Sequence, residues 1–184
     1  GELPQSMGLT RAGARPGDDI WVSGCVGGAW AALMHRWGKL TLDARVFPSA
    51  ALAMDRPNPR NALGTALLSS ATACADISDG LAQDLGHILE RSGVDADVLW
   101  DAVPKHPALA ALSQEQQVEA AMSGGDDYEL VFTAPAVKRG LIEQASISAL
   151  TPVTRIGRII EKKQSGAPLA IRDASGRPLF LPVQ

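Results

Sequence analysis

The sequence has few aromatic residues, few cysteines and no excess of positive charge. Phenylalanine, tryptophan and tyrosine make up 4% of the 184 residues, so alanine, leucine and valine must supply most of the core. The formal net charge is −3 and there is no basic stripe, which argues against nucleic acid as the main partner. Apolar runs fall far short of the roughly 20 residues of a membrane span, and no signal-peptide pattern is present. We therefore expect a globular protein that binds neither nucleic acid nor a membrane.

The two cysteines and three histidines do not form a metal-binding pattern. Cys25 and Cys74 lie far apart in the sequence, each among small and apolar residues. We expect two buried free thiols in a reducing, cytoplasmic setting. No histidine is spaced from either cysteine as in a zinc site.

A starting methionine is also absent, and the first residues read as a loop. We expect this chain to be the C-terminal piece of a longer protein. Its length fits one domain, or one half of a two-domain enzyme.

Hydrophobic periodicity predicts strands and helices in mixed order, and Asn58 with Pro59 is expected to begin the second helix. About six strands and five or six helices, partly as hairpins, imply an α+β layered domain. The predicted strands are 18–23, 95–100, 131–133, 153–160, 169–171 and 179–183, and the predicted helices are 29–37, 61–70, 81–92, 105–112, 114–122 and 137–150.

The stretch Ala75–Leu81 carries two carboxylates and a hydroxyl within four residues. Asp76 is predicted to end a buried strand, and Ser78 or Asp79 to cap the following helix. A helix N-terminus attracts phosphate, and two nearby acids favour a cation such as Mg²⁺ between them. The alternative is a capping arrangement with no ligand, which is common for this pattern.

A second dense stretch, Ser123–Leu130, places two glycines before three acids at the entrance of a strand. Glycine lets the backbone approach a ligand closely. Three acids, Asp126, Asp127 and Glu129, exceed what one solvated turn needs. A charged hairpin turn is the alternative interpretation.

Two glycine-rich segments near the start of the chain are candidates for phosphate binding. Arg11 and Arg15 lie in the loop 8–17 and are candidates for phosphate contact, although they also fit a solvated loop. The turn Gly24–Gly28 lacks the residues of a Walker motif, so we expect tight strand-to-helix packing there.

Together, the stretches Asp76–Leu81 and Gly124–Leu130 resemble the two hallmark segments of the thiamine-monophosphate kinases. The segments Thr10–Asp18, Arg56–Arg60 and Ile156–Ile159 fit the same family. Relatives in the superfamily, such as aminoimidazole ribonucleotide synthase and selenophosphate synthetase, carry Asp-x-Thr-Gly or Asp-x-Thr-Arg at the first motif, whereas this chain has Ser-Asp-Gly-Leu. The resemblance implies the layered α/β/α domain with a mixed sheet that forms the C-terminal domain of this superfamily.

The resemblance also implies an activity, the Mg²⁺-dependent, direct in-line transfer of a phosphoryl group from ATP to thiamine phosphate, giving thiamine diphosphate. By motif, Asp76 and Asp79 would ligate Mg²⁺, and Ser78 and Arg11 would contact ATP. Asp126 would contact the thiamine substrate, where the family more often has a longer Glu.

Departures from the family pattern limit what this chain is expected to do alone. Residues 1–16 would link residues 17–184, the C-terminal domain, to an N-terminal ATP-binding domain that supplies further acids and the homodimer contact. The closing aromatic segment of the family is also missing, and Gly27-Gly28 stands where the family has Gly-Asp. We expect the isolated chain to be inactive. The alternatives are another ATP-using member of the superfamily, or a non-catalytic nucleotide-binding, metal-binding or assembly domain.

Overall fold

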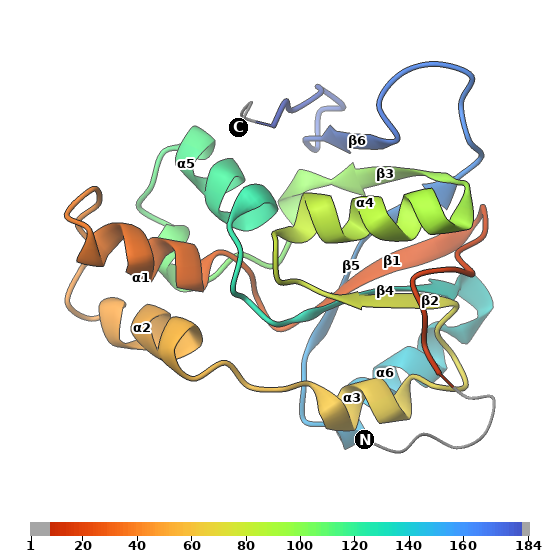
Figure 1. The fold of residues 1–184 in the computed structure, drawn as a ribbon, viewed down its shortest axis with the longest axis horizontal. Coiled ribbons are helices and arrows are strands. Elements are labelled where there is room, and N and C mark those ends of the chain that lie inside the picture. Colours follow the sequence, from red (N-terminus) through yellow and green to blue (C-terminus); the bar gives the residue numbers. More distant parts are fainter. Residues whose placement is uncertain (1–7, 182–184) are drawn as a thin grey trace.

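A six-stranded sheet forms the centre of the protein, in a computed structural model that describes residues 8–181. The strands lie in the order β2-β4-β1-β5-β3-β6 (Figure 1). All neighbours pair antiparallel except β3 and β6, which are parallel, so the sheet is mixed as expected. The strands are β1 (Asp18–Ser23), β2 (Ala73–Asp76), β3 (Asp95–Leu99), β4 (Leu130–Pro135), β5 (Val153–Ile160) and β6 (Leu169–Arg172).

Six α-helices and several shorter helical turns connect these strands. The segment before β4 continues an α-helix as a single π-helical turn, a feature often found near functional sites. The α-helices are α1 (Gly28–Arg36), α2 (Phe47–Asp55), α3 (Asn61–Ala66), α4 (Leu81–Ser92), α5 (Gln114–Val118) and α6 (Arg139–Ser148). The others are the 3₁₀ turns η1 (Trp100–Ala102), η2 (Pro107–Leu109) and η4 (Ala136–Lys138), and the π-helix η3 (Glu119–Ser123).

One face of the sheet is covered by α4, whose apolar positions repeat at helical spacing. Leu81, Leu85 and Ile88 are fully buried against the sheet residues Ile20 and Val22. Burying each such side chain contributes about 1.5–3 kcal/mol relative to leaving it exposed. This helix therefore anchors the loop that precedes it, which holds the first motif.

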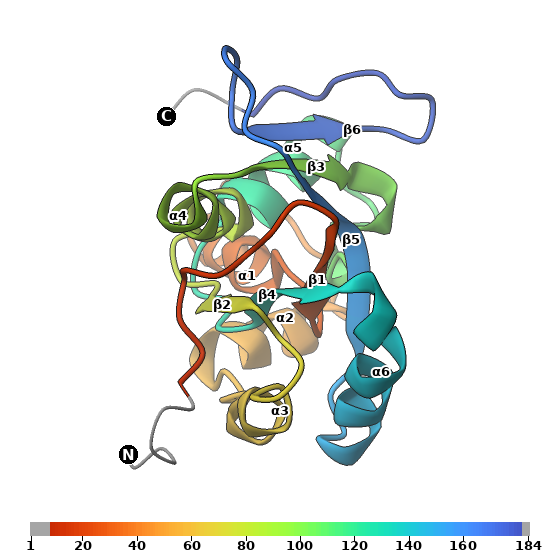
Figure 2. The same cartoon turned by 90° about the vertical axis from the view of Figure 1, so that its right-hand side faces the viewer.

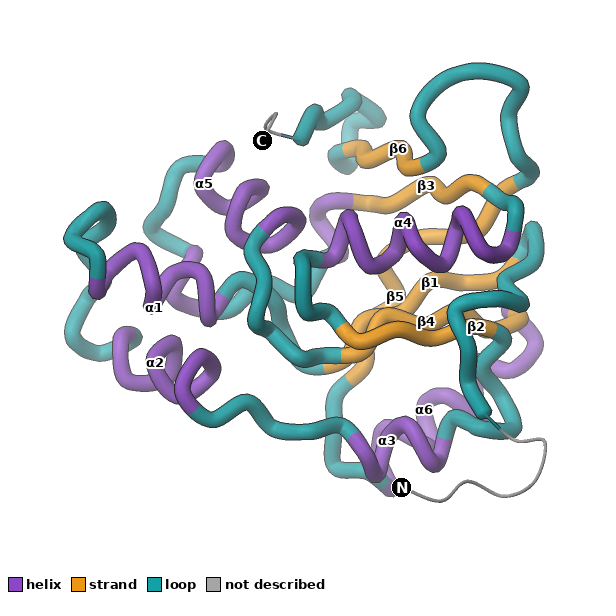
Figure 3. The backbone as a smooth tube through the Cα atoms, in the orientation of Figure 1, coloured by secondary structure: helices purple, strands orange, loops and turns teal. Residues whose placement is uncertain are grey.

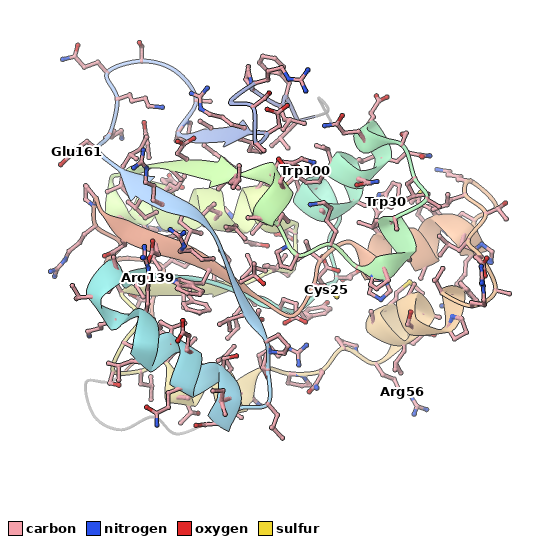
Figure 4. All side chains as sticks on the ribbon, turned by 180° about the vertical axis from the view of Figure 1, so that it is seen from behind. Cys25, Trp30, Arg56, Trp100, Arg139 and Glu161 are labelled. Carbon is pink, nitrogen blue, oxygen red and sulfur yellow. The ribbon has the colours of Figure 1, made fainter. Side chains whose placement is uncertain are left out.

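The other face is covered by α3 and α6, which pack a second, smaller cluster (Figure 2). Leu63 and Ile142 are fully buried there against Trp21 and Phe132, whose rings stack with centroids 6.4 Å apart. Arg139, which is labelled in Figure 4 at the start of α6, forms an ion pair with the buried Asp19 of β1. The α/β/α layering and the α+β class are thus confirmed.

Helices α1 and α2 lie beyond the end of the sheet rather than over it (Figure 1). They pack against each other, with the rings of His35 and Phe47 4.4 Å apart. Ala50 in the middle of α2 is fully buried. Across residues 8–181, no helix combines the length and apolar character needed to cross a membrane.

Several predicted boundaries match the structure, and others were wrong. The strands 18–23 and 153–160 are confirmed. The second predicted helix is shorter and is preceded by Arg60 as its N-cap, so the capping role expected of Asn58 was wrong. The last strand was wrong as well, because residues 179–181 form no strand and residues 182–183 lie outside the described part. Helix α2 was not predicted.

Candidate active site

The two motif segments lie side by side at one end of the sheet (Figure 3). Strands β2 and β4 pair with Asp76 opposite Leu130. Backbone hydrogen bonds continue beyond the strands, since the Ile77 amide donates to the Glu129 carbonyl at 2.7 Å and the Tyr128 amide donates to the Ile77 carbonyl at 2.8 Å. The second motif is therefore part of one site with the first, and is not an isolated hairpin turn.

Close backbone approach explains one glycine of the second motif. The Asp126 amide donates to the Ser78 carbonyl at 3.0 Å, and a Cβ on Gly125 would lie 2.4 Å from the same oxygen. No Cβ tolerates that distance from a backbone atom. Glycine at 125 thus allows the two segments to touch.

We expect Gly125→Ala to push the two motifs apart and to destabilise the protein by about 1–3 kcal/mol, as overpacked sites do. Gly86→Ala is the matched control, because a Cβ on that α4 glycine meets nothing within 4 Å. Alanine is preferred there by about 0.5–1 kcal/mol. Urea unfolding should show opposite signs for the two variants, and equal effects would contradict the proposed contact.

The prediction that Ser78 or Asp79 caps the following helix was wrong. Gly80, with φ 105°, is the N-cap of α4, and no side chain bonds to the helix end there. Instead the buried carboxylate of Asp84 accepts hydrogen bonds from the amides of Ser78 and Asp79, at 2.9 and 3.0 Å. The Asp79 side chain is left exposed, with only a 3.3 Å contact from Gln83.

Three exposed carboxylates surround a single tyrosine at this end of the sheet. Asp76, Asp79 and Asp126 each raise the pKa of Tyr128, whose hydroxyl donates to Asp126 Oδ1 at 3.0 Å. The hydrogen bond to Asp126 is the largest cause of that higher pKa. None of the three acids forms an ion pair with another residue between 8 and 181. Unneutralised acids gathered in this way are suited to a cation.

The donor chemistry fits Mg²⁺ held jointly by protein and substrate. Carboxylate oxygens are its preferred protein ligands, and it commonly takes only one or two of them together with phosphate oxygens and water. No group of three or more acids, histidines or cysteines within the described residues is close enough to hold a metal alone. Asp76 and Asp79 therefore suit a metal that arrives with a phosphorylated ligand.

A cleft of about 1030 Å³ opens beside these acids, between β2 and α3. Arg11, Asp76 and Tyr128 line it, together with Arg60 from the loop before α3. Of the other predicted site residues, Ser78, Asp79 and Asp126 lie on the adjoining loops and outside the lining. The structure thus places Arg11 in the same cleft as Asp76 and Tyr128, and it does not bring Arg15 into the lining.

An ion pair behind this cleft was not predicted from the sequence. Glu129 is 6% exposed, and its carboxylate accepts hydrogen bonds from Arg60 Nε at 2.7 Å and from the Ser23 hydroxyl at 2.5 Å. A second bond from Arg60 Nη2, at 2.5 Å, makes the pair bidentate. The available signal was the alternation of side-chain direction along Gly124–Leu130, which places Tyr128 outward and Glu129 inward. Its partner, Arg60, lies 69 residues earlier in the sequence, and no sequence pattern linked the two residues.

Asp127 occupies the place where a phosphate would bind in a glycine-rich loop. Its carboxylate accepts from the Gly27 amide at 2.8 Å, at the N-terminus of α1. The acid is 9% exposed, and burial raises its pKa to about 7. This agrees with the expectation that Gly24–Gly28 serves packing and not phosphate binding.

The raised pKa of Asp127 gives stability a specific pH dependence. The folded state holds this proton up to about pH 7, whereas the unfolded chain releases it near pH 4, so stability falls as the pH rises between these values. We expect the wild type to lose about 2–3 kcal/mol relative to Asp127→Asn between pH 5 and pH 8. Urea unfolding at both pH values measures this, and a pH-independent difference would contradict it.

Both cysteines are free and half-buried. Burial raises the pKa of Cys25 to about 11 and that of Cys74 to about 12, so both thiols stay protonated at neutral pH (Cys25 is labelled in Figure 4). A protonated thiol is a weak nucleophile. Neither cysteine is a candidate nucleophile, although Cys74 lines the cleft.

Comparison with known proteins shows the family of this chain. Residues 15–169 match the family described as AIR synthase related protein, C-terminal domain. The chain belongs to this family. The AIR synthase related C-terminal domain therefore accounts for most of the chain, including both motif segments.

The relatives of this chain include several thiamine-monophosphate kinases. The thiamine-monophosphate kinase of Salmonella typhimurium is 40% identical over 164 residues, which is 86% of this chain and 50% of that protein. The solved thiamine-monophosphate kinase from Stenotrophomonas maltophilia K279a is 40% identical, with a TM-score of 0.83 over 92% of this chain and 54% of that one. A structure of AaThiL complexed with AMPPCP and TMP is 27% identical, with a TM-score of 0.73 over 93% of this chain and 52% of that one. The chain thus spans about half the length of the relatives it matches.

Proposed function

We propose that this chain is the C-terminal domain of an enzyme that uses ATP to phosphorylate thiamine phosphate to thiamine diphosphate, a step in the biosynthesis of that cofactor. The observation that carries the proposal is the joining of two acidic motifs beside a cleft that also holds Arg11. The similarity to proteins named thiamine-monophosphate kinase supports thiamine phosphate as the substrate. AMPPCP, an ATP analogue, and TMP fit the two substrates of such a kinase.

Each predicted site residue takes a role in this proposal. Asp76 and Asp79 hold Mg²⁺, which neutralises phosphate charge when bound. Ser78 binds the nucleotide phosphates. Arg11 also contacts ATP, since its guanidinium matches phosphate oxygens and lies in the cleft. Asp126 contacts the thiamine substrate, one methylene further back than the Glu more common in the family.

For this reaction the protein must mainly position the two substrates and balance the negative charge of their phosphates. Phosphoryl transfer proceeds in line through a loose transition state, so the site must align the acceptor and balance negative charge. The acceptor is itself a phosphate oxygen that is already ionised, and no general base is required. The exposed carboxylates and the arginine beside the cleft suit these two tasks.

The domain on its own supplies only part of this machinery. We propose that residues 1–16 link it to an N-terminal domain that binds ATP and adds further acids for several Mg²⁺ ions, that the full-length protein is a homodimer, and that it works in the cytoplasm. The isolated chain of 184 residues is then inactive. The chain's span of about half its relatives supports this division.

Titration calorimetry on the full-length protein tests the proposal against its alternatives. We expect thiamine phosphate to bind in the presence of AMPPCP and Mg²⁺, and to bind much more weakly when Mg²⁺ is omitted. Binding that does not depend on Mg²⁺ would favour an assembly or simple binding domain. Binding of the nucleotide with no binding of thiamine phosphate would favour another ATP-using superfamily member.

A further inference from the structure

We propose that Tyr128 is a substrate-contact residue of this same site, and that its ring selects substrates carrying a cationic heterocycle. The proposal rests on the proposed function. Tyr128 is the only tyrosine of the chain, is 41% exposed, and lines the cleft together with Asp76 and Arg11. A large aromatic side chain left open at the edge of a cleft is available to a ligand.

The backbone fixes where this ring lies. Tyr128 adopts φ 50° and Asp126 adopts φ 65°, a left-handed conformation that is uncommon outside glycine. The hydrogen bond from the Tyr128 amide to Ile77 holds that conformation against the end of β2. Strained backbone of this kind persists where the surrounding structure enforces it, and it clusters at ligand-binding sites.

The inward orientation of the next residue, Glu129, determines which way Tyr128 faces. Glu129 points inward and is held by Arg60 and Ser23, so Tyr128 must face the cleft. The positive charge of Arg60 is balanced by Glu129. The lysines found over aromatic rings, Lys39 and Lys105, lie on tryptophans, so within residues 8–181 the tyrosine face carries no cation of the protein.

The electrostatic surroundings of the ring favour a cation. The Asp126 carboxylate, which has no part in the proposed Mg²⁺ site, accepts a hydrogen bond from the Tyr128 hydroxyl at 3.0 Å and raises the pKa of the phenol, which therefore stays neutral. The face of a neutral aromatic ring attracts cations. Thiamine phosphate has a permanently charged thiazolium ring, which this combination of ring face and nearby carboxylate would recognise. Its phosphate end would face the arginine and the metal-binding acids.

The test uses the full-length kinase and three variants, assayed for thiamine diphosphate formation. Tyr128→Leu removes the ring, Tyr128→Phe keeps it, and Phe180→Leu removes an exposed ring outside the cleft as a control. We expect Tyr128→Leu to raise the KM for thiamine phosphate about 5–30-fold, because the cation–π attraction of the ring is lost. Tyr128→Phe should stay within about threefold, and the KM for ATP should change by less than about twofold in all three.

A neutral inhibitor separates charge recognition from general packing. The phosphate ester of hydroxyethyl-methylthiazole has the same thiazole and phosphate but no positive ring, and its inhibition constant should be equal for wild type and Tyr128→Leu. An unchanged KM for thiamine phosphate in Tyr128→Leu would overturn the proposal, as would equal weakening of the neutral inhibitor or of ATP. A wild-type enzyme that forms no thiamine diphosphate would overturn the proposed function, and this proposal with it.

Discussion

Asp79→Asn is expected to lower kcat of the full-length enzyme by about 100-fold or more, because it removes a charged metal ligand. The fold should be unaffected. The Asp79 side chain is exposed and contacts only Gln83, at 3.3 Å. Gly80, and not Asp79, is the N-cap of α4, and the carboxylate of Asp84 holds the loop amides. Turnover and the urea midpoint should both be measured.

Glu143→Gln is the matched control for this variant. It removes the same charge from an exposed position on α6, remote from both motifs. We expect both variants to stay within about 0.5 kcal/mol of wild-type stability, as surface substitutions usually do, and only Asp79→Asn to lose activity. If Asp79→Asn unfolded the protein, or kept full activity at saturating Mg²⁺, the metal-binding role would be wrong.

Glu129→Gln is expected to have the largest effect on stability. Removing one partner of a buried ion pair costs about 3–5 kcal/mol, and we expect about 2–4 here because the Arg60 side chain is 17% exposed. The variant also weakens the acceptor of the Ser23 hydroxyl. The variant should also reduce the order of the cleft residues Tyr128 and Arg60, so the cleft should bind its ligand more weakly.

A surface pair in the same chain provides the comparison. Arg36 and Asp55 also form a bidentate ion pair, but their side chains are 41% and 47% exposed. Asp55→Asn should shift the urea midpoint far less than Glu129→Gln does, because an exposed ion pair contributes little to stability. The double variant Arg60→Gln with Glu129→Gln should be less destabilised than the sum of the two single variants, because no charge is then left without a partner. Additive losses would show that the two side chains act independently.

Local patterns in the sequence predicted those parts of the fold whose signals are local. The alternation in 18–23 and the apolar spacing of Leu81, Leu85 and Ile88 gave β1 and α4 correctly. Asp76 ends β2 as expected. Gly93 ends α4 with φ 67°, as a glycine after a helix often does. The two motifs could be identified because each concentrates acids and glycines within a few residues.

Most of the remaining features depend on contacts between distant residues. Helix α2 is mostly apolar and gains its stability by packing beyond the sheet against α1, so it shows no polar face to reveal its period. One missed support is local, since Asp84 binds the amides of Ser78 and Asp79 only six and five residues before it, an arrangement that a capping pattern does not encode. The partnership of Glu129 with Arg60 spans 69 residues. Sequence reasoning therefore located the two motifs but not the residues that support them.

The central claim is that this domain is one half of a site that transfers phosphate from ATP to thiamine phosphate. The most direct measurement is thiamine diphosphate formation by the full-length protein and by the chain of 184 residues, each with ATP and thiamine phosphate, with and without Mg²⁺. The account predicts product only from the full-length protein, and only with Mg²⁺. Product from the isolated chain, product without any divalent metal, or no product from the full-length protein would contradict it.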